Sequence, residues 1–116
     1  NDLVTIGSHT ENHFKLTGLN DKELFNELYN SKVYLEDLLS KNIMSLSYPH
    51  GKHNNKVREK VKEAGYKLAF SSKFNSNEKQ EDKLCLSRNE IWNSDTIDIL
   101  NQKLLGNWDW MKYRII

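Results

Sequence analysis

The sequence Ser8-His9-Thr10-Glu11-Asn12-His13 decides how this chain is interpreted. It follows a short apolar run, Leu3 to Ile6, and it places two histidines four residues apart. On a helical turn, residues i and i+4 lie on one face, so both imidazoles can bind one metal ion through neutral ring nitrogens. Two solvated histidines on a first helical turn are the alternative, because this spacing also arises easily by chance.

Length and composition limit the possible classes of protein. The chain has 116 residues, which suits a single domain over 1–116 but is short for a complete α/β barrel of ~250 residues. It begins at Asn1 without a charged leader or an apolar signal core, so we expect a piece of a longer protein. The 17 basic and 16 acidic residues nearly balance, which argues against a nucleic-acid partner. We also expect no membrane span, because no apolar run approaches ~20 residues. The single cysteine, Cys85, excludes an internal disulfide and leaves the cellular compartment open.

Strand-like and helix-like segments alternate along the chain. Strands are expected at 3–6, 43–47, 68–70 and 84–87. Helices are expected from an Asn20/Glu23 capping box to Leu39, from Asn54 or Asn55 to the stop at Gly65, and from Asp95 to Leu105. This order indicates an α/β fold with parallel strands, in which the chemistry lies at the carboxyl ends of the strands.

Apolar residues at helical spacing predict the buried face of each helix. In the first helix they are Leu24, Leu28, Leu35, Leu38 and Leu39. In the second they are Val57, Val61 and Ala64, and in the third Ile97, Leu100 and Leu104.

Two motifs together resemble the polysaccharide deacetylase family, which are metal-dependent carbohydrate esterases. His9-Thr10-Glu11-Asn12-His13, followed by Leu16-Thr17, fits the family's H-[ST]-x-x-H motif, which comes after a strand. Ser47-Tyr48-Pro49-His50-Gly51, then Asn54 and Ala64-Gly65-Tyr66, is similar to the family's motif of R-P-P-Y-G or Y-P-Y-G, Asn and a helix ending in A-G-Y. The resemblance covers residues 4–72, with weaker agreement through Arg88.

The resemblance implies a fold, a reaction and a set of site residues. The fold is part of a distorted (β/α) barrel of the glycoside hydrolase/deacetylase type. The reaction, in the complete parent protein, is metal-dependent hydrolysis of acetyl groups from an N- or O-acetylated polysaccharide or oligosaccharide. His9 and His13 would bind a divalent metal, with zinc as the default ion, although iron, cobalt and nickel suit the same kind of donor set. The His50 backbone N–H would stabilise the oxyanion, and Tyr48 and Pro49 are candidates for substrate binding.

The chain also departs from the family pattern. The family's strand with two adjacent aspartates supplies the general base and the third metal ligand, but this chain contains no Asp-Asp pair. The Leu-x-His strand that supplies the general acid is missing too, because no histidine follows His53. We therefore expect the 116-residue chain to be inactive by itself. An inactive remnant of the fold or a carbohydrate-binding module remains the alternative, and a structural zinc domain would need four protein ligands.

Several other residues have two interpretations each. His50 and His53 are a second metal pair, a replacement general acid, or solvated loop histidines. Arg88 either orients the catalytic aspartate, as the resemblance suggests, or forms a surface salt bridge. Four aromatic residues suit stacking on sugars, although the second and third also suit packing of the last helix: Trp92, Trp108, Trp110 and Tyr113. Finally, open strand edges lead us to expect a homodimer.

Overall fold

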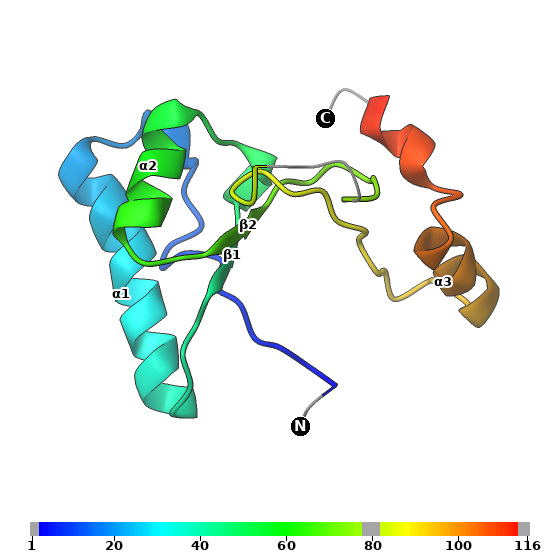
Figure 1. The fold of residues 1–116 in the computed structure, drawn as a ribbon, viewed down its shortest axis with the longest axis horizontal. Coiled ribbons are helices and arrows are strands. Elements are labelled where there is room, and N and C mark those ends of the chain that lie inside the picture. The colour runs from blue at the N-terminus through cyan, green and yellow to red at the C-terminus, as the bar shows by residue number, and fades with distance from the viewer. Residues whose placement is uncertain (1–2, 78–81, 114–116) are drawn as a thin grey trace.

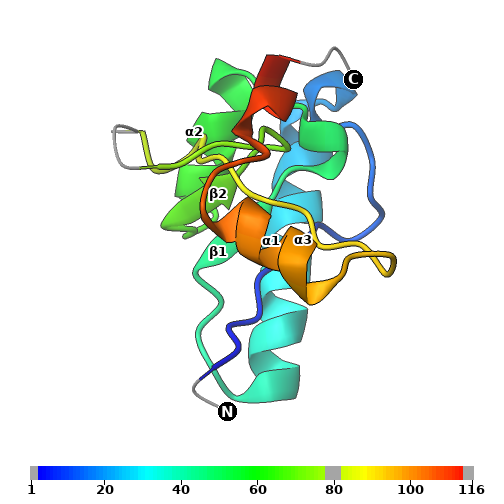
Figure 2. The same ribbon diagram turned by 90° about the vertical axis from the view of Figure 1, so that its right-hand side faces the viewer.

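The structure is a computed structural model that describes residues 3–77 and 82–113. A small parallel sheet of β1 (Ser45–Ser47) and β2 (Leu68–Phe70) lies at its centre. Two helices, α1 (Asp21–Leu39) and α2 (Asn55–Glu63), pack together on one side of this sheet (Figure 1). The helix α3 (Ile97–Leu104) lies beyond the other side, and Figure 2 shows it in front of the sheet and α1.

Four segments run side by side and parallel at the sheet, in the order of the chain. β1 and β2 pair in the register Ser45–Leu68, Leu46–Ala69 and Ser47–Phe70. A single bridge joins Ser8 to Leu46 on one side, and another joins Phe70 to Leu86 on the other. The predicted α/β order of parallel strands is therefore confirmed. Within the described residues, however, the sheet stays open and no barrel closes.

The two outer segments are less regular than the sequence predicts. The run Leu3–Ile6 is not a buried strand: Leu3 is 92% exposed, and Val4 and Ile6 are exposed as well. Only Ser8 joins the ladder, with its N–H 2.9 Å from Ser45 O and its carbonyl 2.9 Å from Ser47 N. The segment at 84–87 likewise pairs only around Leu86. Both segments lie at the outer edges of the described sheet, where a strand has a sheet neighbour on one side only.

The first helix begins where its capping box predicts. Asn20 Oδ1 accepts a hydrogen bond from Glu23 N at 2.9 Å, and Glu23 Oε2 accepts one from Asn20 N at 3.3 Å. Leu24 and Leu28 are fully buried in the core, as predicted. Leu38 is an error of the prediction, because it is 65% exposed. The last turns of α1 extend past the short strands, so nothing in the described chain covers this residue.

The second helix is confirmed in its cap, its buried face and its end. Asn54 Oδ1 accepts from Val57 N at 2.9 Å, and Val57 and Val61 are fully buried. Gly65 follows with a φ of 101°, a conformation that L side chains rarely adopt. Its N–H bonds to Lys62 O, and the next N–H bonds to Val61 O, which is the Schellman arrangement.

The third helix turns a different face inward from the one predicted. Ile97 and Leu104 are exposed, whereas Lys103 is 1% exposed. The Lys103 ammonium lies 2.6 Å from Asp95 Oδ2 and 4.0 Å from the centre of the Trp92 ring. The surroundings of α3 are thus aromatic and acidic, and they favour a long aliphatic stem with a cationic end over leucine. The hydrogen bond from Lys103 keeps the pKa of Asp95 below its ordinary value.

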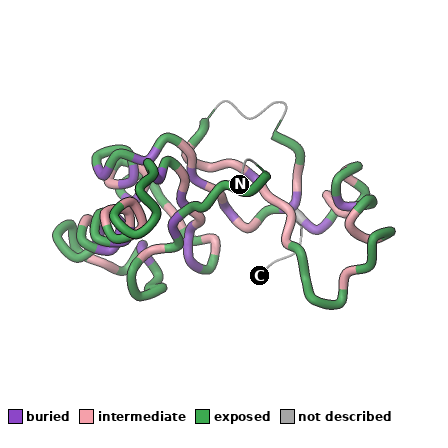
Figure 3. Tube along the Cα trace, turned by 90° about the horizontal axis from the view of Figure 1, so that it is seen from below, coloured by how far each residue is buried: buried purple, intermediate pink, exposed green. Residues whose placement is uncertain are grey.

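Burial is concentrated where α1, α2 and the sheet meet, and the segment around α3 is mostly exposed or half-buried (Figure 3). The Lys103 ammonium lies 5.1 Å from the centre of the Trp108 ring. Trp108 therefore packs against α3, which is one of its two interpretations from the sequence. Trp110 is exposed, and the side chain of Tyr113 lies outside the described residues. None of the helices in the described ranges is long and apolar enough to cross a membrane.

Candidate active site

Two loops leave the carboxyl edge of the sheet next to each other. Residues 9–13 follow the bridged Ser8, and residues 48–51 follow β1. A hydrogen bond joins the two segments: His9 Nδ1 lies 2.7 Å from Ser47 O. A carbonyl only accepts, so this ring nitrogen carries a proton, and in the neutral imidazole Nε2 is then the nitrogen that can bind a metal. This edge is where parallel α/β sheets hold their ligands.

The histidines of the first loop do not lie on a helical turn, which corrects the basis of the prediction. Thr10 and His13 have φ values of 70° and 59°, so the chain reverses direction through two left-handed positions. Thr10 Oγ1 accepts a hydrogen bond from His13 N at 3.2 Å and closes this turn. The rings of His9 and His13 nevertheless meet, with centres 4.7 Å apart. A tight loop therefore produces the proximity that the helical spacing predicts.

A buried carboxylate of α1 fixes the first loop. Glu27 is 4% exposed, and its Oε2 accepts from the backbone N–H groups of Glu11 and Asn12 at 3.0 and 2.8 Å. Its Oε1 accepts from the Asn12 side chain at 2.8 Å. One turn further along α1, Ser31 Oγ lies 2.8 Å from Ser8 Oγ. Both oxygens of Glu27 are thus used, and the backbone of the histidine loop is held from below.

Sequence reasoning missed Glu27 and Ser31, although the sequence carries a signal for them. They follow Leu24 by three and seven residues, so they lie on the same face as Leu24 and Leu28. A carboxylate and a hydroxyl on the buried face of a helix need hydrogen-bond partners. Loop N–H groups after the preceding strand are the nearest candidates.

The second loop begins with two buried residues. Tyr48 and Pro49 are in the core, and Tyr48 Oη donates to Leu84 O at 2.5 Å. Burial raises the pKa of the Tyr48 hydroxyl. The predicted contact of both side chains with substrate is therefore not supported, because neither has accessible surface. Instead they fix the loop that carries His50.

Gly51 packs this loop against the end of β2. It has a φ of 66°, and a Cβ on it would collide with Ser72 Oγ, so glycine is required. The hydrogen bonds of the turn run from Gly51 N to Tyr48 O at 2.9 Å and from Lys52 N to Pro49 O at 3.2 Å. Neither uses the His50 N–H. The role of that N–H as an oxyanion donor remains a prediction.

The structure separates His50 from His53. The exposed His50 ring lies 4.7 Å from the His13 ring, centre to centre, whereas His53 stacks on Tyr48 at the same separation. His53 Nδ1 lies 2.6 Å from Arg58 NH1 and must accept, because a guanidinium only donates. Burial, with Arg58 nearby, lowers the pKa of His53. Arg58 thus takes up Nδ1 of His53 in this arrangement, and a metal pair of His50 and His53 stays a prediction.

Arg88 reaches the same edge from the far side of the sheet. Its Nε donates to Ser71 O at 2.9 Å, directly after β2, and its NH1 lies 3.5 Å from Glu90 Oε1. The salt bridge that was the alternative interpretation of Arg88 therefore exists. Orientation of a catalytic carboxylate remains a prediction.

The donor set fits a divalent metal in part. A histidine ligand usually donates its second ring N–H to a carbonyl or carboxylate, as His9 does to Ser47 O. Among the described residues, no three side chains of His, Cys, Asp or Glu are already arranged to hold an ion. His9 and His13 would therefore supply two ligands, with further donors still needed.

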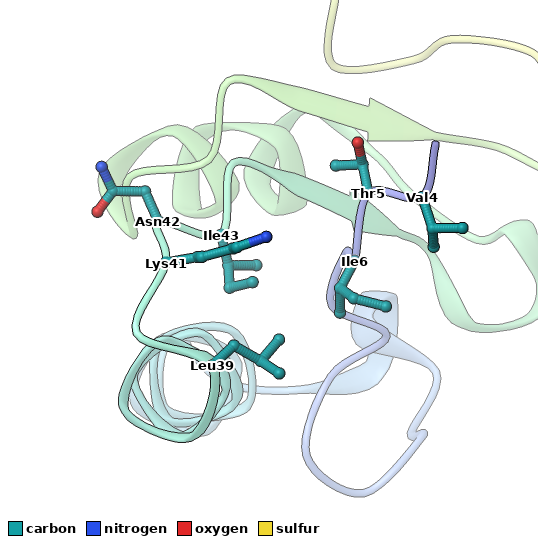
Figure 4. A pocket seen from close by; sticks show the side chains of 7 residues that line it. All are labelled: Val4, Thr5, Ile6, Leu39, Lys41, Asn42 and Ile43. Carbon is teal, nitrogen blue, oxygen red and sulfur yellow. The ribbon is translucent and has the colours of Figure 1, made fainter. Parts of the chain in front are cut away.

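A pocket of 540 Å³ lies away from these loops. Its lining comes from residues 4–6 and 41–43, which precede the bridged Ser8 and β1, and from Leu39 at the end of α1. Figure 4 shows Ile6 and Leu39 facing each other across it. The pocket is thus at the amino edge of the sheet and is separate from the histidine loops.

Residues 1–69 match the family model described as polysaccharide deacetylase. The chain belongs to this family. A candidate polysaccharide deacetylase of Bacillus subtilis (strain 168), YxkH, is 26% identical over 69 residues, which are 60% of this chain and 25% of that protein.

Solved polysaccharide deacetylases share the fold. A Streptococcus pyogenes deacetylase in complex with acetate superposes with a TM-score of 0.72 and 26% identity, covering 84% of this chain and 43% of that one. A Bacillus cereus polysaccharide deacetylase gives a TM-score of 0.72 and 23% identity, over 86% of this chain and 32% of that one. The chain therefore spans less than half the length of these deacetylases.

Proposed function

We propose that the complete protein removes acetyl groups from N- or O-acetylated saccharides, with a divalent metal held in part by His9 and His13. The observation that carries this proposal is the meeting of these two rings, 4.7 Å apart, with His9 anchored through Nδ1. Family membership supports the reaction class. The similar S. pyogenes deacetylase binds acetate, which is the product of such a reaction.

The residues of this chain would divide the work as follows. A bound divalent cation lowers the pKa of a water molecule toward ~7 and polarises the acetyl carbonyl. His9 and His13 hold the cation, and the Nδ1–H of His9 keeps its ring in the correct orientation. As water attacks the acetyl carbon, the His50 N–H donates to the oxyanion. A carboxylate from outside this chain takes the proton of the water, and Arg88 orients it. A general acid from outside this chain then donates a proton to the sugar nitrogen or oxygen as its bond to the acetyl carbon breaks, and acetate leaves.

The test uses the complete protein with His9→Ala, His13→Ala and, as the matched histidine control, His53→Gln. Metal content is measured by mass spectrometry, and acetate release is measured with acetylated chitooligosaccharides. We expect both alanine variants to lose stoichiometric metal and to release acetate only at background rate, whereas the control keeps its metal. Unchanged metal content in both alanine variants would overturn the metal role.

The 116-residue chain alone should release no acetate. It lacks the Asp-Asp base and the Leu-x-His acid, each typically worth ~10²–10⁴-fold in rate. Release at rates ordinary for an enzyme would contradict our assignment of the base. The second candidate function is that of a non-catalytic saccharide-binding protein. It predicts that the complete protein binds the oligosaccharide without releasing acetate.

A further inference from the structure

Three buried hydroxyl groups connect the end of α2 with the histidine loop, residues 9–13. They belong to Ser8, Ser31 and Tyr66, which are 2%, 8% and 2% exposed. We call these three groups the hydroxyl network. We infer that Tyr66 and Ser31 are positioning residues, which act through Ser8 to hold the left-handed turn of the histidine loop. This inference rests on the proposed function, in which the two histidines of that loop bind the metal.

Tyr66 anchors one end of the hydroxyl network to α1. It is the tyrosine of the Ala64-Gly65-Tyr66 sequence that follows α2, and its Oη donates to Leu28 O at 2.8 Å. Burial raises the pKa of Tyr66, so the hydroxyl keeps the proton that it donates. Ser31 Oγ lies 3.4 Å from the same Oη. The end of α2 is thereby joined to the middle of α1, at the position of Ser31.

The direction of the hydrogen bonds follows from the protons available, because each hydroxyl has only one. Ser31 Oγ lies 3.0 Å from Glu27 O and 3.1 Å from Leu28 O, and since a carbonyl only accepts, Ser31 is the donor. Ser8 Oγ, 2.8 Å from Ser31 Oγ, then donates to Ser31. Ser8 Oγ in turn accepts from Thr10 N at 3.2 Å. The hydrogen bonds therefore run in one direction, from the Thr10 N–H through both serines to the backbone of α1.

Thr10 depends on this support because its backbone conformation is unfavourable. Its φ is 70°, which is rare for a β-branched residue and persists only where the surrounding structure holds it. Ser8 is a fixed acceptor for its N–H, because both backbone groups of Ser8 are paired with β1. His9 precedes Thr10 and His13 closes the same turn, so a change in the Thr10 backbone would separate the two rings, whose centres lie 4.7 Å apart.

Each of the four backbone N–H groups at residues 10–13 has its own acceptor. Glu27 Oε2 accepts from Glu11 N and Asn12 N, and Thr10 Oγ1 accepts from His13 N. The N–H of Thr10 is the one that the hydroxyl network takes. Loss of the network would free this N–H and leave the other three bonded. Its effect should therefore be concentrated at Thr10, whereas a general loss of stability would affect all four groups together.

The test measures hydrogen exchange of single amides by NMR in the metal-free 116-residue chain. Ser8→Ala, Ser31→Ala and Tyr66→Phe each remove one hydroxyl of the network. Tyr34→Phe removes a hydroxyl from an exposed part of α1 and is the matched control. Val57→Ala is the control for stability, since it removes core volume from α2 without removing a hydroxyl. The readouts are the exchange rate of the Thr10 amide relative to that of the Glu11 amide, and the nuclear Overhauser effect between the rings of His9 and His13.

We expect the relative exchange of Thr10 to rise roughly tenfold in Ser8→Ala, roughly fivefold in Ser31→Ala and roughly twofold in Tyr66→Phe, because the hydroxyl removed lies further from Thr10 at each step. The Overhauser effect between the two rings should weaken in the same order. Tyr34→Phe should leave the ratio unchanged, and Val57→Ala should speed both amides alike. Unchanged ratios in Ser31→Ala and Tyr66→Phe, or an equal rise for both amides, would overturn the inference.

A Co²⁺ titration of the complete protein, followed by visible absorption, separates this inference from the proposed function. Ser31→Ala should weaken Co²⁺ binding roughly fivefold, in proportion to the opening of the turn, and Tyr34→Phe should leave it unchanged. Equal Co²⁺ affinity in Ser31→Ala and the parent, despite a changed exchange ratio, would show that the network does not position the metal ligands and would overturn the inference. If the parent binds no Co²⁺ while the exchange ratios change as expected, the proposed function fails and the hold on the turn stands.

Discussion

Glu27 is a buried residue of α1 whose carboxylate binds the histidine loop, residues 9–13. Three donors, two from the backbone and one from Asn12, converge on its two oxygens. In Glu27→Gln one oxygen becomes an NH₂ group, which faces a donor. We expect a loss of about 1–3 kcal/mol in the free energy of unfolding, the usual cost of an unsatisfied buried group. Metal affinity should fall with it, because the loop carries His9 and His13.

Urea unfolding of the chain measures the first effect, and Co²⁺ titration measures the second. Glu59→Gln is the matched control, since Glu59 is an exposed residue of α2. Equal unfolding midpoints for the two variants would show that the three hydrogen bonds to Glu27 contribute nothing to stability.

For single residues, the sequence predicts which side chains come together better than it predicts the backbone conformation that brings them together. The proximity of His9 and His13 follows from their spacing, but the helical turn that was to explain it is a loop with left-handed residues. The contact between His13 and His50 was not predicted. It joins two loops that are 37 positions apart, which the pairing of Ser8 with β1 and the hydrogen bond from His9 to Ser47 O bring together.

Among the elements, the turn at Pro49–Gly51 is the one whose shape depends most on a single residue. Gly51→Ala forces a Cβ into Ser72 at a positive φ. Strain of this kind costs of order 1–3 kcal/mol. We therefore expect Gly51→Ala to lower the urea midpoint clearly and to weaken the contact of His50 with His13.

Gly18→Ala is the control for this experiment. Gly18 belongs to a short 3-10 turn (Leu16–Gly18), and a Cβ there would meet nothing within 4 Å. Its midpoint should stay close to that of the parent chain. A fall as large as that of Gly51→Ala would mean that general loss of glycine, and not the contact with Ser72, is responsible.

Helices with local signals were predicted well, and so were the central strands β1 and β2, whereas the outer segment at 3–6 and the buried face of α3 were not. The caps at Asn20 and Asn54 and the stop at Gly65 act within one turn of the chain, so the sequence alone reveals them. The buried face of α3 depends on Asp95 and Trp92, which attract Lys103 inward. The strand expected at 3–6 depends on a neighbour that the described chain does not provide.

For the whole molecule, the open sheet leads us to expect a dimer. The segment before Ser8 exposes the side chains of Leu3, Val4 and Ile6, and Ser8 lies at one edge of the described sheet. Pairing with a second copy would cover this apolar surface. Light scattering at micromolar concentration should give about twice the chain mass of 13.7 kDa.

A charge placed on the edge segment distinguishes dimerisation by strand pairing from nonspecific association of exposed apolar side chains. Val4→Lys should shift the chain toward monomer, because an edge lysine opposes strand pairing. Tyr34→Lys places the same charge on an exposed part of α1 and should leave the dimer intact. A clean monomer of the parent chain would contradict the expected dimer.

The side-by-side order of Ser8, β1, β2 and Leu86 has a consequence during synthesis. Each segment finds its partner already made, so the sheet can grow as the ribosome releases the chain, N-terminal part first. The two histidine loops would mature at different moments. The first needs Glu27, β1 and Tyr66, whereas the second waits for Ser72 and Leu84 to emerge. In a nascent chain paused before residue 72, His9 and His13 would thus already be in place. His50 would not, because its loop would lack its contacts with Ser72 and Leu84.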